Sequence, residues 1–186
     1  GVAAAGWRGL TLAQSAAEDL NSARLPATEL VGDVALRMLQ VREGSFKVLT
    51  FTEAGHSAAQ VKKVIDELQA DIAATRALLK DQALSAIWKD EERRTFLLIG
   101  ERFESFSRAV LDAMDMRDTG IASSATFLST ADEHYVLLSG LMQELVKKQR
   151  HLSEAGAEES RSAVTLAKQQ LLVVSLVGLL LTAGVA

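Results

Sequence analysis

Two arginines on the first long helical stretch are the residues of this sequence best suited to hold a ligand. Arg37 falls between Val34 and Val41 on an apolar seam, and Arg42 follows five residues later beside Met38. A guanidinium among apolar side chains is costly unless an anion or an acidic partner meets it. Guanidinium groups match carboxylates through paired hydrogen bonds. The two arginines therefore predict a site for a small carboxylate.

Hydroxyl-bearing side chains on the last helical stretch can complete such a site. Thr126, Ser129 and Thr130 begin this stretch, and Tyr135 follows. Counted from the two apolar ends of the chain, Arg42 lies level with Tyr135. Hydroxyls both donate and accept hydrogen bonds, so they can finish the hydrogen bonding of a small anion. The predicted ligand-binding residues are Arg37, Arg42, Thr126, Ser129, Thr130 and Tyr135.

The same residues also have a purely structural interpretation. Serine and threonine are common at helix starts, where they satisfy backbone groups. Arg37 could pair with Asp33 or with Glu133 instead of a ligand. Both interpretations stay open at the level of sequence.

Other chemistry has little support. The absence of cysteine excludes thiol catalysis, thiolate metal sites and disulfides. The three histidines are His56, His134 and His151, and they form neither the Glu-x-x-His pairs of di-iron bundles nor a zinc-binding repeat. A haem with His134 as an axial ligand is the one cofactor alternative. We find no nucleophile–base set, phosphate loop or general-acid pair, so we expect no enzyme, no metal and no cofactor.

Composition restricts the fold class. Of 186 residues, 48% are apolar and only one is proline. The commonest residue types are those that lose least conformational freedom in a helix. The length allows one domain with a substantial core. The net charge of −4 argues against a nucleic-acid partner, which would require a basic face.

Four helical stretches are predicted from apolar residues spaced by three and four. The first contains Pro26, where a kink or a short break is expected. In the turn that follows, Gly55 can take a positive φ and Ser57 can cap the second helix. Asp90 or a neighbour can cap the third helix, and the fourth begins near Ser123. The breaks between helices are expected at 54–57, 85–90 and 117–120.

The spacing also predicts which side chains form the core. The predicted seams are Ala27, Leu30, Val34, Val41, Val48 and Phe51; Val61, Ile65, Leu68, Ile72, Thr75 and Leu79; Phe96, Ile99, Phe103, Phe106, Val110 and Ala113; Leu138, Leu141, Leu145, Leu152, Ala155 and Leu166. Such heptad-like steps favour small crossing angles, and short connections make neighbouring helices antiparallel. The predicted fold is an all-α, antiparallel up-down-up-down four-helix bundle.

Both ends of the chain are apolar, which predicts a membrane protein. Residues 171–186 carry no charge and are somewhat fewer than the roughly 20 that span a bilayer. We interpret 169–186 as the start of a second transmembrane helix and 1–8 as the end of a first, with Trp7 and Arg8 as an interfacial anchor. Residues 9–168 then form one extracytoplasmic domain. A cleaved signal peptide and a buried tail helix of a soluble protein are the alternatives.

The order of membrane end, four helices and membrane helix resembles a known family across essentially the whole chain. Together with the stretch Asp19-Leu20-Asn21-Ser22-Ala23-Arg24-Leu25-Pro26-Ala27, it is similar to the four-helix ligand-binding domain of methyl-accepting chemotaxis proteins. Some sensor histidine kinases use the same domain. The resemblance implies a homodimeric receptor of the bacterial inner membrane, with this domain in the periplasm and a small carboxylate or amino acid as its ligand.

In aspartate-sensing members of that family, a pair of arginines on the first helix holds the ligand carboxylates. Arg37 and Arg42 are similar in placement and spacing. The family usually has a further arginine about one turn later, where this chain has Phe46 beside Lys47. The chain therefore departs from the aspartate-sensing pattern at this position, which argues against aspartate as the ligand.

Three other functions fit the same pattern. The domain could belong to a sensor histidine kinase or a cyclase. It could be a ligandless dimerisation stalk or bind another protein. It could also be a soluble helical scaffold with an apolar tail helix.

Overall fold

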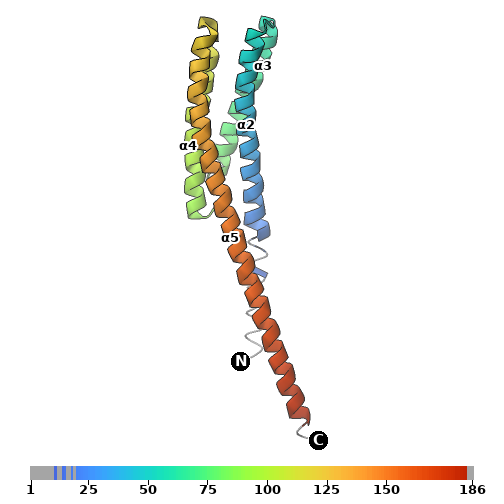
Figure 1. Cartoon of the computed structure of the whole chain (residues 1–186). Helices are drawn as coiled ribbons and strands as arrows, with labels where there is room; N and C mark the ends of the chain where they lie inside the picture. Colours follow the sequence, from blue (N-terminus) through green and yellow to red (C-terminus); the bar gives the residue numbers. More distant parts are fainter. Residues whose placement is uncertain (1–10, 12–13, 16–17, 19, 184–186) are drawn as a thin grey trace. The chain divides into compact units, whose positions relative to one another are not determined.

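The computed structural model contains six helical elements in the part of the chain that it describes (Figure 1). Described are residues 11–183 without 12–13, 16–17 and 19, and without the side chains of 20–21, 118, 121, 156–157, 159–160, 163–164 and 166–183. The elements are the π-helix η1 (Leu20–Arg24), α2 (Leu25–Glu53), α3 (Ala58–Gln82), α4 (Asp90–Asp115), the 3-10 helix η2 (Met116–Thr119) and α5 (Ile121–Ala183). No strand occurs among these residues, so the predicted all-α class with four long helices is confirmed.

The chain divides into two compact units. The larger unit is Ala27–Lys148, and the other combines Gly1–Pro26 with Gln149–Ala186. Within the larger unit, α2, α3, α4 and the first part of α5 run side by side as a helical bundle (Figure 1). All buried hydrophobic residues of the described part, from Ala27 to Leu145, belong to this unit.

The centre of the larger unit is the face of α4 that carries three phenylalanines. Phe96, Phe103 and Phe106 are each at most 1% exposed. Removing a side chain of this size from water stabilises the fold by roughly 2–3 kcal/mol. All predicted seam residues of α3 and α4 are buried, as the three-four spacing requires. The sequence pattern was therefore sufficient for these two helices.

The buried face of α2 is rotated from its predicted position. Leu30 and Phe51 were expected in the core and are only partly buried, whereas Val31 and Met38 are fully buried. The rotation moves Arg37 off the apolar seam, and its side chain is 38% exposed. Ala27, Val34, Val41 and Val48 are buried as predicted. The prediction that Arg37 lies on the seam is wrong, because Met38 takes the buried position between Val34 and Val41.

The break predicted at Pro26 occurs just before it, as the π-helix η1. A proline has no N–H for the preceding turn, and its ring collides with the carbonyl four residues earlier. A wider π turn carries that carbonyl aside and lets the chain continue into α2. The first helical stretch is thus interrupted at Leu20–Arg24 rather than continuous.

The turn between α2 and α3 has the predicted chemistry. Gly55 has φ 72°, and the N–H groups of Gly55 and His56 donate to the carbonyls of Thr52 and Phe51. This pair of bonds is a Schellman motif, and the His56 ring stacks on Phe51 at 4.3 Å. Ser57 then caps α3 reciprocally with Gln60.

The start of α4 agrees with the expectation that Asp90 or a neighbour caps this helix. The residue before the first turn of α4 is Lys89, so Asp90 is not the cap. The N–H of Lys89 donates instead to the buried Glu92 at 3.0 Å. Trp88 closes the connection: its ring is 3% exposed, stacks on Phe96 and donates to the Gln82 carbonyl.

Ser124 fixes the start of α5. Gly120 has φ 128° and ends the short helix η2, so α5 begins at Ile121, two residues before the expected start. The first turn of α5 brings the fully buried Ser124 against the end of α4, where its hydroxyl donates to the Ala113 carbonyl at 2.5 Å. This bond ties α5 to α4 at the turn.

Along α5, the predicted seam is partly correct. Leu138 and Leu145 are buried, and Leu141 is partly buried, but Ala155 is exposed. The side chain of Leu166 and the expected membrane segment 1–8 lie outside the described residues. For 169–186, only the helical backbone as far as Ala183 is described. Among the residues described, no helix is long and apolar enough to cross a membrane.

Candidate functional site

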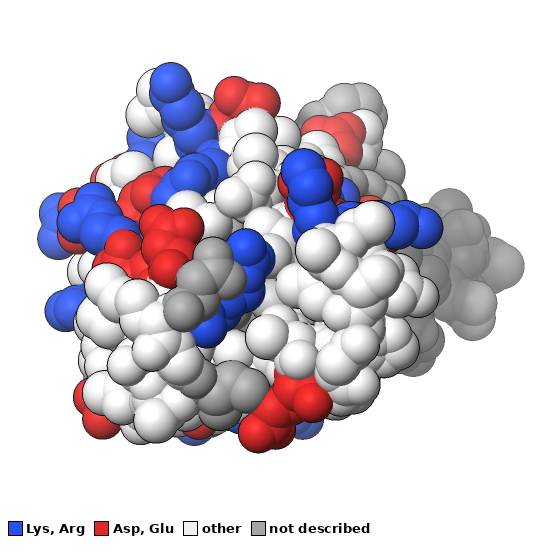
Figure 2. Space-filling view, turned by 90° about the horizontal axis from the view of Figure 1, so that it is seen from above, with Lys and Arg blue, Asp and Glu red and all other residues white. Residues whose placement is uncertain are grey.

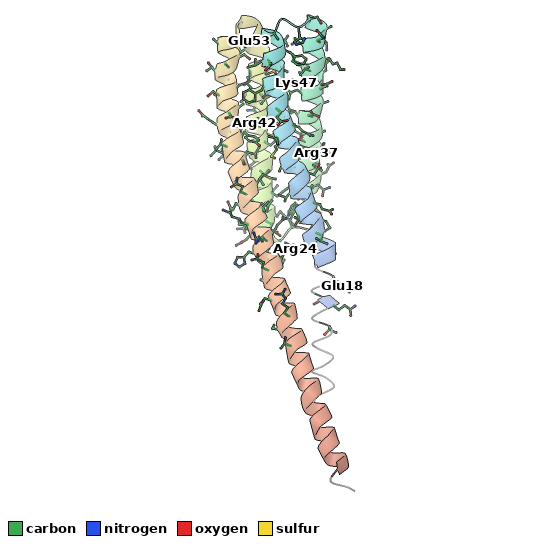
Figure 3. The ribbon with its side chains drawn as sticks, turned by 45° about the vertical axis from the view of Figure 1, so that its right-hand side comes forward. Glu18, Arg24, Arg37, Arg42, Lys47 and Glu53 are labelled. Atoms are coloured by element: carbon green, nitrogen blue, oxygen red, sulfur yellow. The ribbon has the colours of Figure 1, made fainter. Side chains whose placement is uncertain are left out.

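The two candidate arginines lie on different sides of α2. Residues five positions apart on a helix are separated by about 140° around its axis. The Nε of Arg37 donates to Asp33, one turn earlier on the same helix, at 3.0 Å. Arg37 and Arg42 stand at successive heights on α2 in Figure 3. The structure therefore does not bring the two guanidinium groups together within this chain.

Arg42 is the centre of a contact cluster between α2 and α5. Its Nε donates to the carboxylate of Asp132 at 2.6 Å. The guanidinium carbon lies 5.4 Å from the centroid of the Phe46 ring and 5.0 Å from that of Tyr135. Tyr135 in turn packs on Phe106 of α4, with ring centroids 5.8 Å apart. Arg42 is thus held by one acid and two aromatic rings.

The surroundings of Arg42 favour its charged form. The hydrogen bond to Asp132 raises the pKa of Arg42, and the negative charge of the same carboxylate adds to this effect. The two side chains are 34% and 40% exposed. Such partly exposed pairs contribute about 0.2–1 kcal/mol to stability, because water screens them. The pair positions α2 against α5 more than it stabilises the fold.

The hydroxyl cluster divides into two groups. Thr126 and Thr130 donate to carbonyls of their own helix, those of Ala122 and Thr126, at 3.0 and 3.4 Å. Ser129 is exposed and lines a groove beside the Arg42 cluster. Of the predicted site residues, Arg42 and Tyr135 are in contact between α2 and α5, and Thr126 and Thr130 are in contact within α5.

A groove between α2 and the first turns of α5 lies next to this cluster. It has a volume of about 370 Å³. The α2 wall is apolar, and the α5 wall combines apolar with polar side chains. The lining residues are Phe46, Leu49, Ala125, Leu128, Ser129, Asp132, Glu133 and Val136. Phe46 and Val136 are 44% and 63% exposed, so the groove has an apolar rim open to solvent.

A second hollow of about 450 Å³ lies between α2 and α3. Its lining is more polar and includes Glu43, Lys47, Glu67 and Asp71. Lys47 and Glu67 approach to 3.9 Å across it. Charged side chains of both signs line this hollow, and it has no apolar wall comparable to that of the α2–α5 groove.

Charged side chains of both signs are mixed on the end of the molecule (Figure 2), and the described acids and histidines form no metal-binding group. Viewed onto its end, the molecule has blue and red side chains next to one another, with uncharged areas between them (Figure 2). Among the described residues, no group of three or more histidine, aspartate and glutamate side chains is placed to hold a metal ion.

The sequence analysis did not identify Asp132 as the acidic partner of Arg42. Asp132 follows the hydroxyl cluster and lies three positions before Tyr135. Arg42 was expected level with Tyr135. Asp132 lies one turn earlier on the same helix face, so its carboxylate is within reach of the Arg42 guanidinium. Phe46 was noted only because an arginine is missing there, although its ring contacts Arg42. The apolar groove residues gave no signal that distinguished them from core residues.

Comparison with known proteins does not assign the chain to a family: no family model matches it, and no curated protein matches it either. The function is therefore argued from the geometry of the bundle and its groove.

Proposed function

We propose that this chain is the extracytoplasmic sensor module of a bacterial transmembrane receptor, of the kind found in methyl-accepting chemotaxis proteins. The module binds a small organic molecule in the groove between α2 and α5. It passes the signal on by a displacement of α5. The observation that carries this proposal is an open, apolar-walled groove whose one wall is the helix that continues to Ala183.

The contacts of the larger unit support an up-down-up-down arrangement. Arg76 of α3 pairs with Glu104 of α4 at 2.9 Å, and Lys148 of α5 reaches Thr95 near the start of α4. Ser124 at the start of α5 also bonds the carbonyl of Ala113 at the end of α4, so α4 and α5 pair early residues with late ones, as antiparallel neighbours do. Four such helices return the chain to the side from which it started.

The apolar sequence of residues 171–186 supports a membrane attachment of α5. In the proposed mechanism, the ligand changes the equilibrium between two arrangements of α2 and α5. A ligand can do so only by binding one arrangement more tightly than the other. Because α5 is one helix from the groove onward, a small shift or tilt is transmitted along it.

The location can be tested by cysteine labelling, since the sequence has no native cysteine. Glu101 is exposed on α4, so Glu101→Cys gives a single reactive thiol on the larger unit. We expect a membrane-impermeant maleimide to label this variant of the full chain in intact spheroplasts. Cytosolic thiols serve as the control that the membrane is closed. Labelling only after lysis would contradict the receptor proposal.

Ligand binding can be tested separately by thermal shift with organic acids, amino acids and amines. A ligand at 100 times its dissociation constant adds about 2.7 kcal/mol to stability. Phe46→Ala should weaken the response to a groove ligand, because Phe46 lines the groove. Arg37→Ala should leave it unchanged, because Arg37 is outside the lining and is engaged with Asp33. An equal loss in both variants would place the ligand elsewhere.

The internal ion pairs favour one alternative function. Both arginines that were predicted to hold a ligand already have acidic partners, at 3.0 and 2.6 Å. A ligandless dimerisation stalk would need no other occupant. The stalk would be supported if no compound of the panel caused a thermal shift while Glu101→Cys was still labelled in intact spheroplasts.

A further inference from the structure

The charges at the α2–α5 groove have the opposite sign to that expected for a carboxylate site. The two ionisable side chains in its lining are Asp132 and Glu133, and both are acidic. Arg42 lies beside the groove and donates its Nε to Asp132. One positive and two negative charges therefore leave this site with a net charge of −1.

Glu133 is the acidic side chain of the groove that can meet a charged group of a ligand. Its side chain is exposed, and among the described residues no cationic side chain pairs with it. Asp132 is 40% exposed and keeps part of its carboxylate open to water while Arg42 holds one oxygen. An incoming carboxylate would have to compete with Asp132 for Arg42 and would meet Glu133. An incoming ammonium would meet two acceptors without displacing any contact.

The rest of the groove requires an apolar body on the ligand. Phe46 and Leu49 form the α2 wall, and Leu128 and Val136 face them from α5. Phe46 and Val136 are the exposed members of these walls, and covering them with an apolar group removes them from water, which favours binding. The Phe46 ring also attracts cations, as its contact with Arg42 at 5.4 Å illustrates.

We propose that the groove binds an organic ammonium ion that carries an apolar hydrocarbon group. Its charge is met by Glu133 and Asp132, and its hydrocarbon lies between Phe46 and Val136. This inference depends on the proposed sensor function and specifies the chemical class of its ligand. Asp132 and Glu133 set the preference for a positive charge, and Arg42 positions Asp132.

The test compares three probes of the same hydrocarbon skeleton and different charge. They are 3-methylbutylammonium, L-leucine and 4-methylpentanoate, with net charges of about +1, 0 and −1 at neutral pH. Binding to the full chain in lipid nanodiscs is measured by isothermal titration calorimetry, with empty nanodiscs as the blank. We expect 3-methylbutylammonium to bind at least about tenfold more tightly than 4-methylpentanoate, since two favourable charge contacts are replaced by repulsions.

Two variants separate charge recognition from structural damage. Glu133→Gln should weaken binding of 3-methylbutylammonium about threefold, the effect of one exposed charge pair. The double variant Asp132→Asn/Glu133→Gln leaves Arg42 as the remaining charge, and its preference should change to 4-methylpentanoate. A merely structural loss would weaken all three probes alike. Asp112→Asn, an exposed acid on α4, is the matched control and should bind like the unmodified chain.

The proposal is overturned if 4-methylpentanoate binds as tightly as the amine, or if none of the three probes binds. It is also overturned if the double variant retains the preference for the amine. These outcomes are read from the purified chain and are independent of cysteine labelling in spheroplasts. An amine-selective groove on a chain labelled only after lysis would refute the receptor and leave the ligand class standing.

Discussion

At the scale of the residue, two arginines of the described bundle have an acidic partner on another helix. Arg42 and Asp132 join α2 to α5, and Arg76 joins α3 to Glu104 and to the buried Ser107. Such pairs are too exposed to contribute much energy, but they fix which residues meet across an interface. The chemistry of the groove follows from one of these choices, since pairing with Asp132 removes Arg42 as a free anion receptor.

Lys148 provides a test of these charges by pH. Its hydrogen bond to Glu144, at 2.8 Å, raises its pKa above the ordinary value of 10.5, and the charges of Glu91 and Glu92 act in the same direction. A raised pKa in the folded state means that the stabilisation is complete below about pH 10.5 and is lost as the pH rises through the folded value. Stability should therefore depend on this lysine at neutral pH and not at strongly alkaline pH.

We expect Lys148→Gln to lower the free energy of unfolding by a constant amount between pH 6 and 9, and by a decreasing amount above about pH 10.5. Urea unfolding followed by circular dichroism at each pH measures the difference. Lys80→Gln is the control, because Lys80 is exposed near the end of α3 and should change little at any pH. A difference that grows above pH 10.5 would contradict the assignment.

At the scale of the element, turns and caps determine where the helices end. The α2–α3 turn uses Gly55 at φ 72° and Ser57 as a reciprocal cap, and the α4–α5 connection uses Gly120 at φ 128°. Both glycines have open space where a Cβ would lie, so their role is conformational rather than steric. Gly32, in contrast, lies within α2 and has no such conformational need.

This contrast predicts opposite effects of the same substitution. Gly55→Ala should destabilise the fold by about 1 kcal/mol, because a left-handed residue with a Cβ is strained. Gly32→Ala should stabilise it by about 0.5–1 kcal/mol, because alanine loses less backbone entropy in a helix. Urea midpoints of the two variants give the signs. If both substitutions raised or both lowered the stability, a factor other than backbone conformation would determine the effect.

At the scale of the whole molecule, the core belongs to one unit. The buried hydrophobic residues of the described part extend from Ala27 to Leu145, and the compact unit ends at Lys148. A unit with a continuous core of this kind should fold without the rest of the chain. The receptor proposal requires the same property, since a sensor must keep its fold while its attachment moves.

We expect the fragment 27–148 to be helical and to unfold in a single cooperative transition. A shorter fragment, 27–120, should not, because it lacks α5 and the buried side chains of Leu128, Leu138 and Leu145. Circular dichroism, with calorimetric and van't Hoff enthalpies compared, measures cooperativity. If 27–148 binds hydrophobic dyes and melts gradually, the division into units does not reflect folding.

The sequence by itself determined the helices and most of their core. The seams of α3 and α4, the break at Pro26 and the turn chemistry at Gly55 and Ser57 follow from local rules, because spacing and backbone preferences act within a few residues. The expectation that Arg42 and Tyr135 lie at the same height followed from counting residues along the helices, because an α-helix has a fixed rise per residue.

Tertiary packing decided the rest. The rotation of α2, which exposes Arg37 and buries Met38, depends on the volume of side chains on other helices, and periodicity alone does not fix it within one row. The partner of Arg42 was likewise undecided, since Asp132 is 90 positions away along the chain. The charge beside the groove is a sum over two helices that only their contact brings together. For that reason the sequence did not reveal that two acids line the groove and that one of them pairs with Arg42.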